Sequence, residues 1–84
     1  MADAKIQVLI ASPERVLFNG AAMSLSFPGE QGTFEVLPFH RPLVSRLLAG
    51  SVEVDGRAFS IRRGAVRVAD DVVTAVVELS ESTR

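Results

Sequence analysis

The chain contains no cysteine, no tryptophan and no tyrosine, and its 84 residues include a single histidine, His40. Without cysteine, disulfide bonds, thiolate catalysis and cysteine metal sites are all excluded, and a reducing compartment fits this composition. A zinc site needs three or four ligands, which one histidine without cysteine does not favour. We therefore expect no metal site.

The sequence also lacks an excess of charge and a long apolar run. Nine basic and ten acidic residues give a formal net charge of −1, so the basic excess typical of nucleic-acid binding is missing. No apolar stretch approaches the roughly 20 residues of a membrane-spanning helix, and the start MADAKIQVLI is unlike a signal peptide. We expect one soluble domain over residues 1–84, with no nucleic-acid partner and no membrane-spanning segment.

What the chain does contain is a series of short alternating segments. In KIQVLI, the residues Ile6, Val8 and Ile10 share one face of a predicted strand. In AMSLSF, one face holds Met23, Leu25 and Phe27. Turn signals separate such segments, at residues 12–14, 19–20 and 28–32.

The segment SVEVDGRAFSI predicts a hairpin. Its loop Asp55–Gly56 suits a type I′ turn, because both residues tolerate positive φ. A two-residue loop places Val54 opposite Arg57 and Val52 opposite Phe59. Valine, phenylalanine and isoleucine then share one face, so register and hydrophobic pattern agree.

A second hairpin is predicted in GAVRVADDVVTAVVEL, turning near Asp70–Asp71. The expected register places Val68 opposite Val73 and brings Arg63 opposite Glu78, a cross-strand charge pair. Because Asp-Asp is a poorer type I′ loop than Asp-Gly, a one-residue slip and a longer loop remain alternatives.

One segment, RPLVSRLLAG, leaves the choice between helix and strand open. The spacing of Leu43, Val44 and Leu47 fits a helix that Gly50 ends, whereas the extended form alternates only loosely. The other segments are short strands bounded by turn residues, which favours an all-β sandwich or barrel.

His40 is the one candidate for proton transfer, since imidazole titrates near neutral pH. Ser45 and several carboxylates are present, but no nucleophile motif accompanies them. The segment PGEQG has two glycines without the lysine and helix of a phosphate loop, and it is more simply a turn. Residues alone therefore predict a small β-module with no catalytic residue and no cofactor.

Five elements in order carry a resemblance to a known family. They are Ser12–Glu14, Phe18–Gly20, the segment GEQGTFEVLPFHRPL from Gly29 to Leu43, Gly50 before a valine-rich strand, and Gly64 to Val77. In this order and spacing they resemble the epsilon subunit of F-type ATP synthases, over nearly the whole chain.

The resemblance implies a flattened β-sandwich of about ten short strands in two sheets, and it favours a strand for PLVSRLL. It implies a non-catalytic rotor subunit of the central stalk that connects the gamma subunit to the c-ring and couples ion translocation to ATP synthesis or hydrolysis. The expected partners are the gamma subunit, the c-ring and the wider complex, at the cytoplasmic face of the plasma membrane, peripherally.

The resemblance also implies site residues. By their place in the motif, Glu30, Gln31 and Gly32 resemble the loop that contacts the c-ring. His40, Arg41 and Leu43 resemble the region that faces gamma and the ring.

The family usually has a glycine at the positions of Glu35 and Phe39 and a small residue at that of Arg41. The loop backbone here therefore either does without positive φ or reaches it with strain.

The family's C-terminal helical hairpin is not expected in this chain, which leads us to expect a rotor connector that does not inhibit hydrolysis. The alternatives are a small β-barrel enzyme or ligand-binding module centred on His40, and a generic protein-interaction β-module.

Overall fold

A computed structural model describes residues 4–80, and the described part consists of eight β-strands joined by turns and short loops. The strands are β1 (Ile6–Ala11), β2 (Val16–Ala22), β3 (Leu25–Gly29), β4 (Gly32–Val36), β5 (Leu43–Leu47), β6 (Gly50–Val54), β7 (Arg57–Ala69) and β8 (Val72–Leu79). The predicted all-β class is confirmed.

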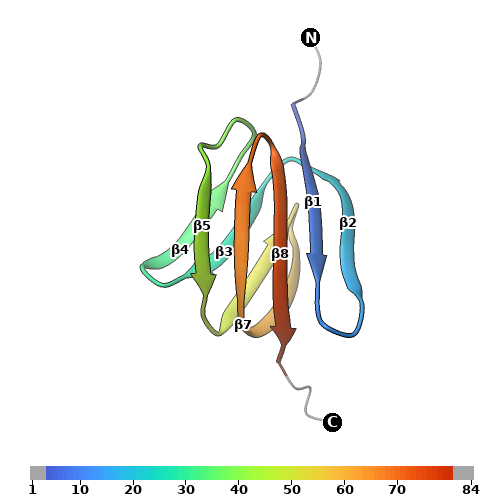
Figure 1. The fold of residues 1–84 in the computed structure, drawn as a ribbon, viewed down its shortest axis with the longest axis vertical. Coiled ribbons are helices and arrows are strands. Elements are labelled where there is room, and N and C mark those ends of the chain that lie inside the picture. The colour runs from blue at the N-terminus through green and yellow to red at the C-terminus, as the bar shows by residue number, and fades with distance from the viewer. Residues whose placement is uncertain (1–3, 81–84) are drawn as a thin grey trace.

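Figure 1 shows these strands as two layers, with β5, β8, β1, β2 and the second half of β7 in front and β3, β4 and β6 crossing behind. Hydrogen bonds follow the order β2-β1-β8-β7-β5-β3-β4, and β6 pairs with β3 and β7. The long strand β7 belongs to both layers, because its first residues pair with β6 and its later residues with β5 and β8. The sandwich is therefore one continuous hydrogen-bonded sheet folded on itself.

The structure has eight strands within residues 4–80, fewer than the roughly ten expected for the sandwich. Strand β7 accounts for part of the difference, since the second strand of the first predicted hairpin and the first strand of the next are one 13-residue strand. The register shifts once inside β7, between Ile61 and Arg63, where a bulge lets the chain bend without ending the strand.

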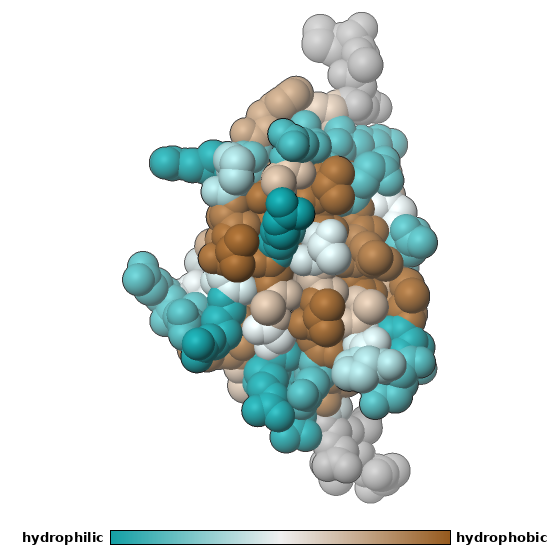
Figure 2. All heavy atoms as spheres, viewed as in Figure 1, coloured by the Kyte–Doolittle hydropathy of each residue, from teal (hydrophilic) through white to brown (hydrophobic). Residues whose placement is uncertain are grey.

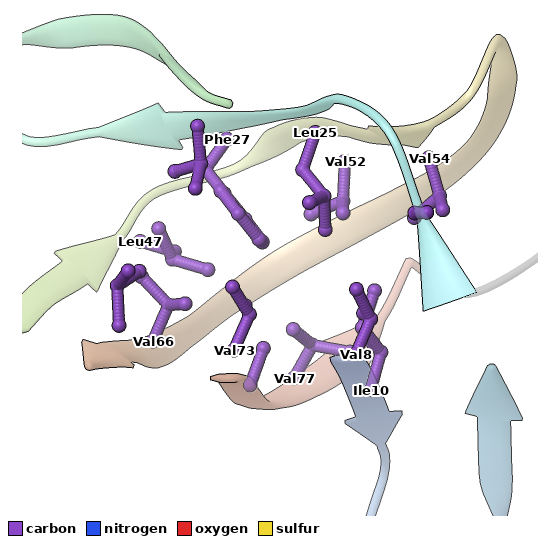
Figure 3. Packing of buried hydrophobic residues seen from close by; sticks show 14 of the residues in the cluster. Val8, Ile10, Leu25, Phe27, Leu47, Val52, Val54, Val66, Val73 and Val77 are labelled. Atoms are coloured by element: carbon purple, nitrogen blue, oxygen red, sulfur yellow. The ribbon is translucent and has the colours of Figure 1, made fainter. Parts of the chain in front are cut away.

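The two layers enclose the hydrophobic core. Figure 3 shows Leu25, Phe27, Val52 and Val54 of the rear layer pointing toward residues of the front layer, among them Val73. The predicted inward face of β1 is confirmed, since its three apolar residues are all buried. Burial of such side chains stabilises the domain by about 1.5–3 kcal/mol each.

The first predicted hairpin is confirmed in register and in turn type. Val54 pairs with Arg57 and Val52 with Phe59 across β6 and β7. The loop residues Asp55–Gly56 have φ values of 47° and 87°, the left-handed backbone that a type I′ turn requires.

The second hairpin also has the predicted register, without a slip. Val68 pairs with Val73 and Arg63 with Glu78, and the Nε atom of Arg63 lies 3.2 Å from Oε1 of Glu78. Both residues of the loop Asp70–Asp71 have positive φ, 54° and 59°. Aspartate reaches this backbone more readily than most residues, so Asp-Asp forms the turn that Asp-Gly forms elsewhere.

The carboxylate of Asp55 ties the first hairpin to the bend between β2 and β3. Its Oδ1 accepts the backbone N–H groups of Met23 and Ser24, each at 3.0 Å. We expect Asp55→Ala to lower the free energy of unfolding by about 2 kcal/mol, because it removes these bonds and leaves alanine at positive φ. Urea denaturation measures the loss. Asp55→Asn keeps an acceptor and tolerates the backbone, so it should lose less than half as much; equal losses would contradict this account.

The turn predicted at Asn19–Gly20 is wrong. Both residues lie inside β2 and pair with β1, at Leu9 and Val8 respectively. The chain has already reversed at residues 12–15, where the Ser12 hydroxyl accepts the backbone N–H groups of Glu14 and Arg15 at 3.3 and 3.2 Å. Because the chain reverses at residues 12–15, Asn19 and Gly20 lie within the second strand instead of in a turn.

Two details of β3 also differ from the prediction. Met23 is 49% exposed and Ala22 is buried instead, because a bend at residues 23–24 interrupts the alternation before Leu25. Pro28 and Gly29 do not end the strand; they pair with β4, and the turn falls at residues 30–31.

The helix alternative for RPLVSRLLAG is excluded. Leu43–Leu47 forms β5, which pairs antiparallel with β7 from Leu43↔Val68 to Leu47↔Gly64. The strand alternates as a sheet requires, with Leu47 buried and Val44 77% exposed. Pairing with β7 decides between two conformations that the local pattern left equal.

Candidate interaction surface

The β3–β4 turn and strand β5 form an open depression of about 450 Å³. Its lining includes Glu30, Gln31, Gly32, His40 and Leu43, so five of the six residues assigned by resemblance lie around one hollow. They come from the β3–β4 turn, the start of β4, the β4–β5 loop and the start of β5. Arg41, the sixth, is exposed and is not part of the lining.

Two charged groups meet at this depression. Nη1 of Arg46 on β5 lies 3.7 Å from Oε2 of Glu30 on the β3–β4 turn, and both side chains are largely exposed. An exposed pair at this distance contributes at most about 1 kcal/mol. It leaves both groups accessible to a partner.

His40 has no catalytic neighbours in the described part of the chain. Its Nδ1 lies 2.6 Å from the carbonyl oxygen of Arg41, so Nδ1 carries the proton and donates. The hydroxyl of Ser45 donates to the carbonyl oxygen of Arg46 at 2.9 Å instead of to the imidazole. This arrangement orients the ring within its loop and does not pair it with a nucleophile, so the enzyme alternative is not favoured.

Among residues 4–80 no group of three or more metal-ligating side chains comes together. The same residues contain no helix long and apolar enough to cross a membrane.

The loop of residues 37–42 holds an unusual backbone. Phe39 has a φ of 69°, in the left-handed region, whereas Glu35 lies in β4 and is not among the residues with positive φ. The sequence left open whether the backbone at these two positions has positive φ. It does at Phe39, where a side chain makes it strained, and it does not at Glu35. Left-handed backbone costs a residue with a side chain about 1–2 kcal/mol.

A second surface feature is the outer face of the front layer. Val44, Val72 and Val76 are exposed apolar residues on β5 and β8, and Leu9 of β1 continues the face beyond β8. The register aligns Val44, Arg67 and Thr74 in one cross-strand row. Figure 2 shows this face with brown patches around a teal side chain and pale residues near its middle, and with further teal groups at the rim. We call it the outer sheet face.

The outer sheet face was not among the site residues assigned from the sequence, although the sequence carries its signal. In VVTAVVEL the inner face is wholly apolar and the outer face is partly so, since Val72 and Val76 stand on either side of Thr74 on the exposed face. Strands that are apolar on both faces are usually covered on both sides. Contiguous exposed apolar surface rimmed by polar groups is typical of protein–protein contact.

The fold and these surfaces define a small β-sandwich with an exposed, partly apolar sheet face. Residues 5–82 match the family model described as the ATP synthase, Delta/Epsilon chain, beta-sandwich domain. The chain therefore belongs to that family.

Curated relatives agree with this assignment. The ATP synthase epsilon chain of a Nitratiruptor species is 41% identical over 78 residues, which cover 87% of this chain and 60% of the relative. The ATP synthase epsilon chain of Leptospira interrogans serovar copenhageni is 33% identical over 82 residues, which cover 93% of this chain and 65% of the relative. The chain thus spans only about three fifths of the length of these relatives.

Solved structures share the fold. A chain of the Euglena gracilis mitochondrial ATP synthase (OSCP/F1/c-ring) superposes with a TM-score of 0.80 at 22% identity, covering 88% of this chain and 51% of that one. A chain of the Tetrahymena thermophila mitochondrial ATP synthase central stalk and c-ring gives 0.75 at 12% identity, covering 93% and 66%. At these identities the likeness concerns the fold.

Proposed function

We propose that this chain is a central-stalk rotor subunit of an F-type ATP synthase, which connects the gamma subunit to the c-ring. In this role it couples ion translocation to ATP synthesis or hydrolysis and catalyses no reaction itself. The family assignment supports the proposal, and the outer sheet face is the observation that carries it. Exposed apolar surface on a small domain is typical of a site that binds another protein.

The depression supports the assignment of residues within that role. Glu30 and Gln31 form the β3–β4 turn and Gly32 begins β4, and this exposed end of the hairpin suits contact with polar loops of the c-ring. His40, Arg41 and Leu43 lie at the beginning of β5 and on the loop before it, and they are proposed to face gamma and the ring. The Glu30–Arg46 pair leaves both charges exposed for such contacts.

The outer sheet face is the part proposed to bind gamma. Its exposed valines lie on β5 and β8, which both pair with β7 in one hydrogen-bonded sheet, so their positions are held rigidly. A rigid surface loses little conformational freedom on binding. As part of such a complex, the chain is proposed to lie peripherally at the cytoplasmic face of the plasma membrane.

The experiment that tests this function is co-expression of a tagged chain with the gamma subunit of the same organism. We expect the two to co-purify at a one-to-one ratio. Failure to pair with folded gamma would contradict the rotor function. The enzyme alternative predicts a turnover that His40→Ala eliminates, whereas the rotor function predicts no turnover and a weaker association in this variant.

A further inference from the structure

Phe39 differs from the other phenylalanines of the chain. Phe27 is buried, and Phe18, Phe34 and Phe59 pack against the core as partly buried residues. Phe39 is 81% exposed. A single exposed apolar side chain is ordinary at a protein surface, so exposure by itself indicates nothing about Phe39.

The backbone of Phe39 makes the exposure informative. Its φ of 69° is a conformation that bulky residues rarely adopt and that glycine adopts freely. Folding stability would favour glycine or asparagine here, because the exposed ring makes no large contribution to the core. Residues whose strained backbone does not stabilise the fold in some other way are found mainly at functional sites.

The neighbouring groups hold Phe39 in this conformation. Its backbone N–H donates to Oδ1 of Asp71 at 2.7 Å, which ties the β4–β5 loop to the turn between β7 and β8. The backbone N–H of His40 donates to the carbonyl oxygen of Leu37 at 3.1 Å, closing a turn around Phe39. Figure 1 shows this loop and the β7–β8 turn side by side at one end of the sandwich. The ring is therefore presented by a fixed loop.

We propose that Phe39 is an aromatic anchor that inserts into an apolar pocket on a protein partner of this domain. The inference rests on the proposed function, since the partner is a component of the rotor. An aromatic ring on a preorganised loop is the kind of residue that dominates binding energy at protein interfaces. Leu37, itself half exposed, adds apolar surface beside it.

A protein pocket fits this loop better than a lipid surface does. The turn that holds Phe39 carries Asp70 and Asp71, which outnumber the one arginine of the loop, the exposed Arg41, so the charge around the ring does not favour the anionic surface of a membrane. Asp70 is exposed beside the loop, so it would approach the headgroups together with the ring.

The test compares three substitutions at this position. Phe39→Gly and Phe39→Asn both permit the left-handed backbone but remove the ring, and Phe39→Tyr retains it. Affinity is measured for the purified gamma subunit and, separately, for the c-ring in detergent. We expect the glycine and asparagine variants to bind one of these partners about tenfold or more weakly. The tyrosine variant should remain within about threefold of the original chain.

Thermal unfolding of the isolated domain separates this role from a structural one. The glycine and asparagine variants should have an unfolding midpoint equal to or above that of the original chain, because strain is relieved. A clearly lower midpoint in both variants would show that the ring stabilises the fold and would overturn the proposal. Unchanged affinity for both partners would overturn it as well.

The remaining outcomes are also distinguishable. If the original chain binds neither gamma nor the ring, the proposed function fails and the anchor fails with it. If the original chain binds and the ring-free variants bind equally, the anchor alone fails. Binding to phosphatidylglycerol vesicles that depends on Phe39 would replace the protein pocket by a lipid surface and overturn the choice of partner.

Discussion

Val76→Asp is expected to abolish co-purification of this chain with the gamma subunit while leaving its fold intact. Val76 is 55% exposed on β8, so a carboxylate at this position stays hydrated in the isolated domain. In the complex the same carboxylate would lose its hydration in a mostly apolar contact, where its nearest cation, Arg67 on β7, is a diagonal neighbour and pairs with it incompletely. Burying a charge that is incompletely paired costs several kcal/mol, which is enough to reduce an ordinary affinity beyond detection.

The matched control adds the same charge elsewhere on the domain. Ser51 is an exposed residue of β6 in the rear layer, away from the outer sheet face. Ser51→Asp should leave gamma binding within about twofold of the original. Circular dichroism and urea denaturation confirm that both variants fold. If both aspartate variants bind gamma equally well, the outer sheet face is not the gamma surface.

Gly64→Ala is expected to destabilise the domain by about 1–3 kcal/mol, a large share of the total for a small protein. Gly64 lies where β7 passes β8, opposite Val77. A Cβ atom there would be 2.5 Å from the carbonyl oxygen of Val76 and 2.9 Å from Cγ1 of Val77. The first neighbour is backbone, so relief requires the two strands to separate.

A second glycine of the chain provides the control. Gly20 also lies inside a strand, β2, but the nearest atoms to an added Cβ belong to the Phe18 ring, at 3.8 and 3.9 Å. Gly20→Ala should therefore leave stability unchanged or raise it by up to about 1 kcal/mol, since alanine restricts the unfolded chain. Urea denaturation measures both variants. Equal stabilities for the two would show that β7 and β8 tolerate the extra atom.

Much of the fold was predictable because its information is local. Asp55–Gly56 specifies both a turn type and a loop length, so it fixed the register of β6 and β7 before any tertiary contact was known. The Asp70–Asp71 hairpin was predictable for the same reason, with its valines confirming the register. The prediction of a turn at Asn19–Gly20 was wrong although its local signal is equally strong. Residues 12–15 have already reversed the chain, so no second turn is needed there and the two residues lie in β2.

The candidate site was predictable only by resemblance. No local pattern distinguishes Glu30–Gly32 from an ordinary turn. His40 is eight or more residues further along the chain, so the sequence does not show that both line one depression. The outer sheet face had a sequence signal in the two-sided apolar pattern of β8. That signal could not identify which neighbours on β5 and β1 would complete the face.

The sequence by itself determined the all-β class, both two-residue hairpins and the family, since each depends on residue types at fixed spacing along the chain. The local pattern of residues 43–47 left helix and strand open, and only the resemblance favoured a strand. The tertiary structure excludes the helix, because pairing with β7 satisfies backbone groups that a helix would satisfy internally. It alone decided that β7 serves both layers, since the bulge after Ile61 redirects the strand without ending it. It also decided that Phe39 is held in a left-handed conformation, because the carboxylate that fixes its backbone comes from a turn 32 residues away.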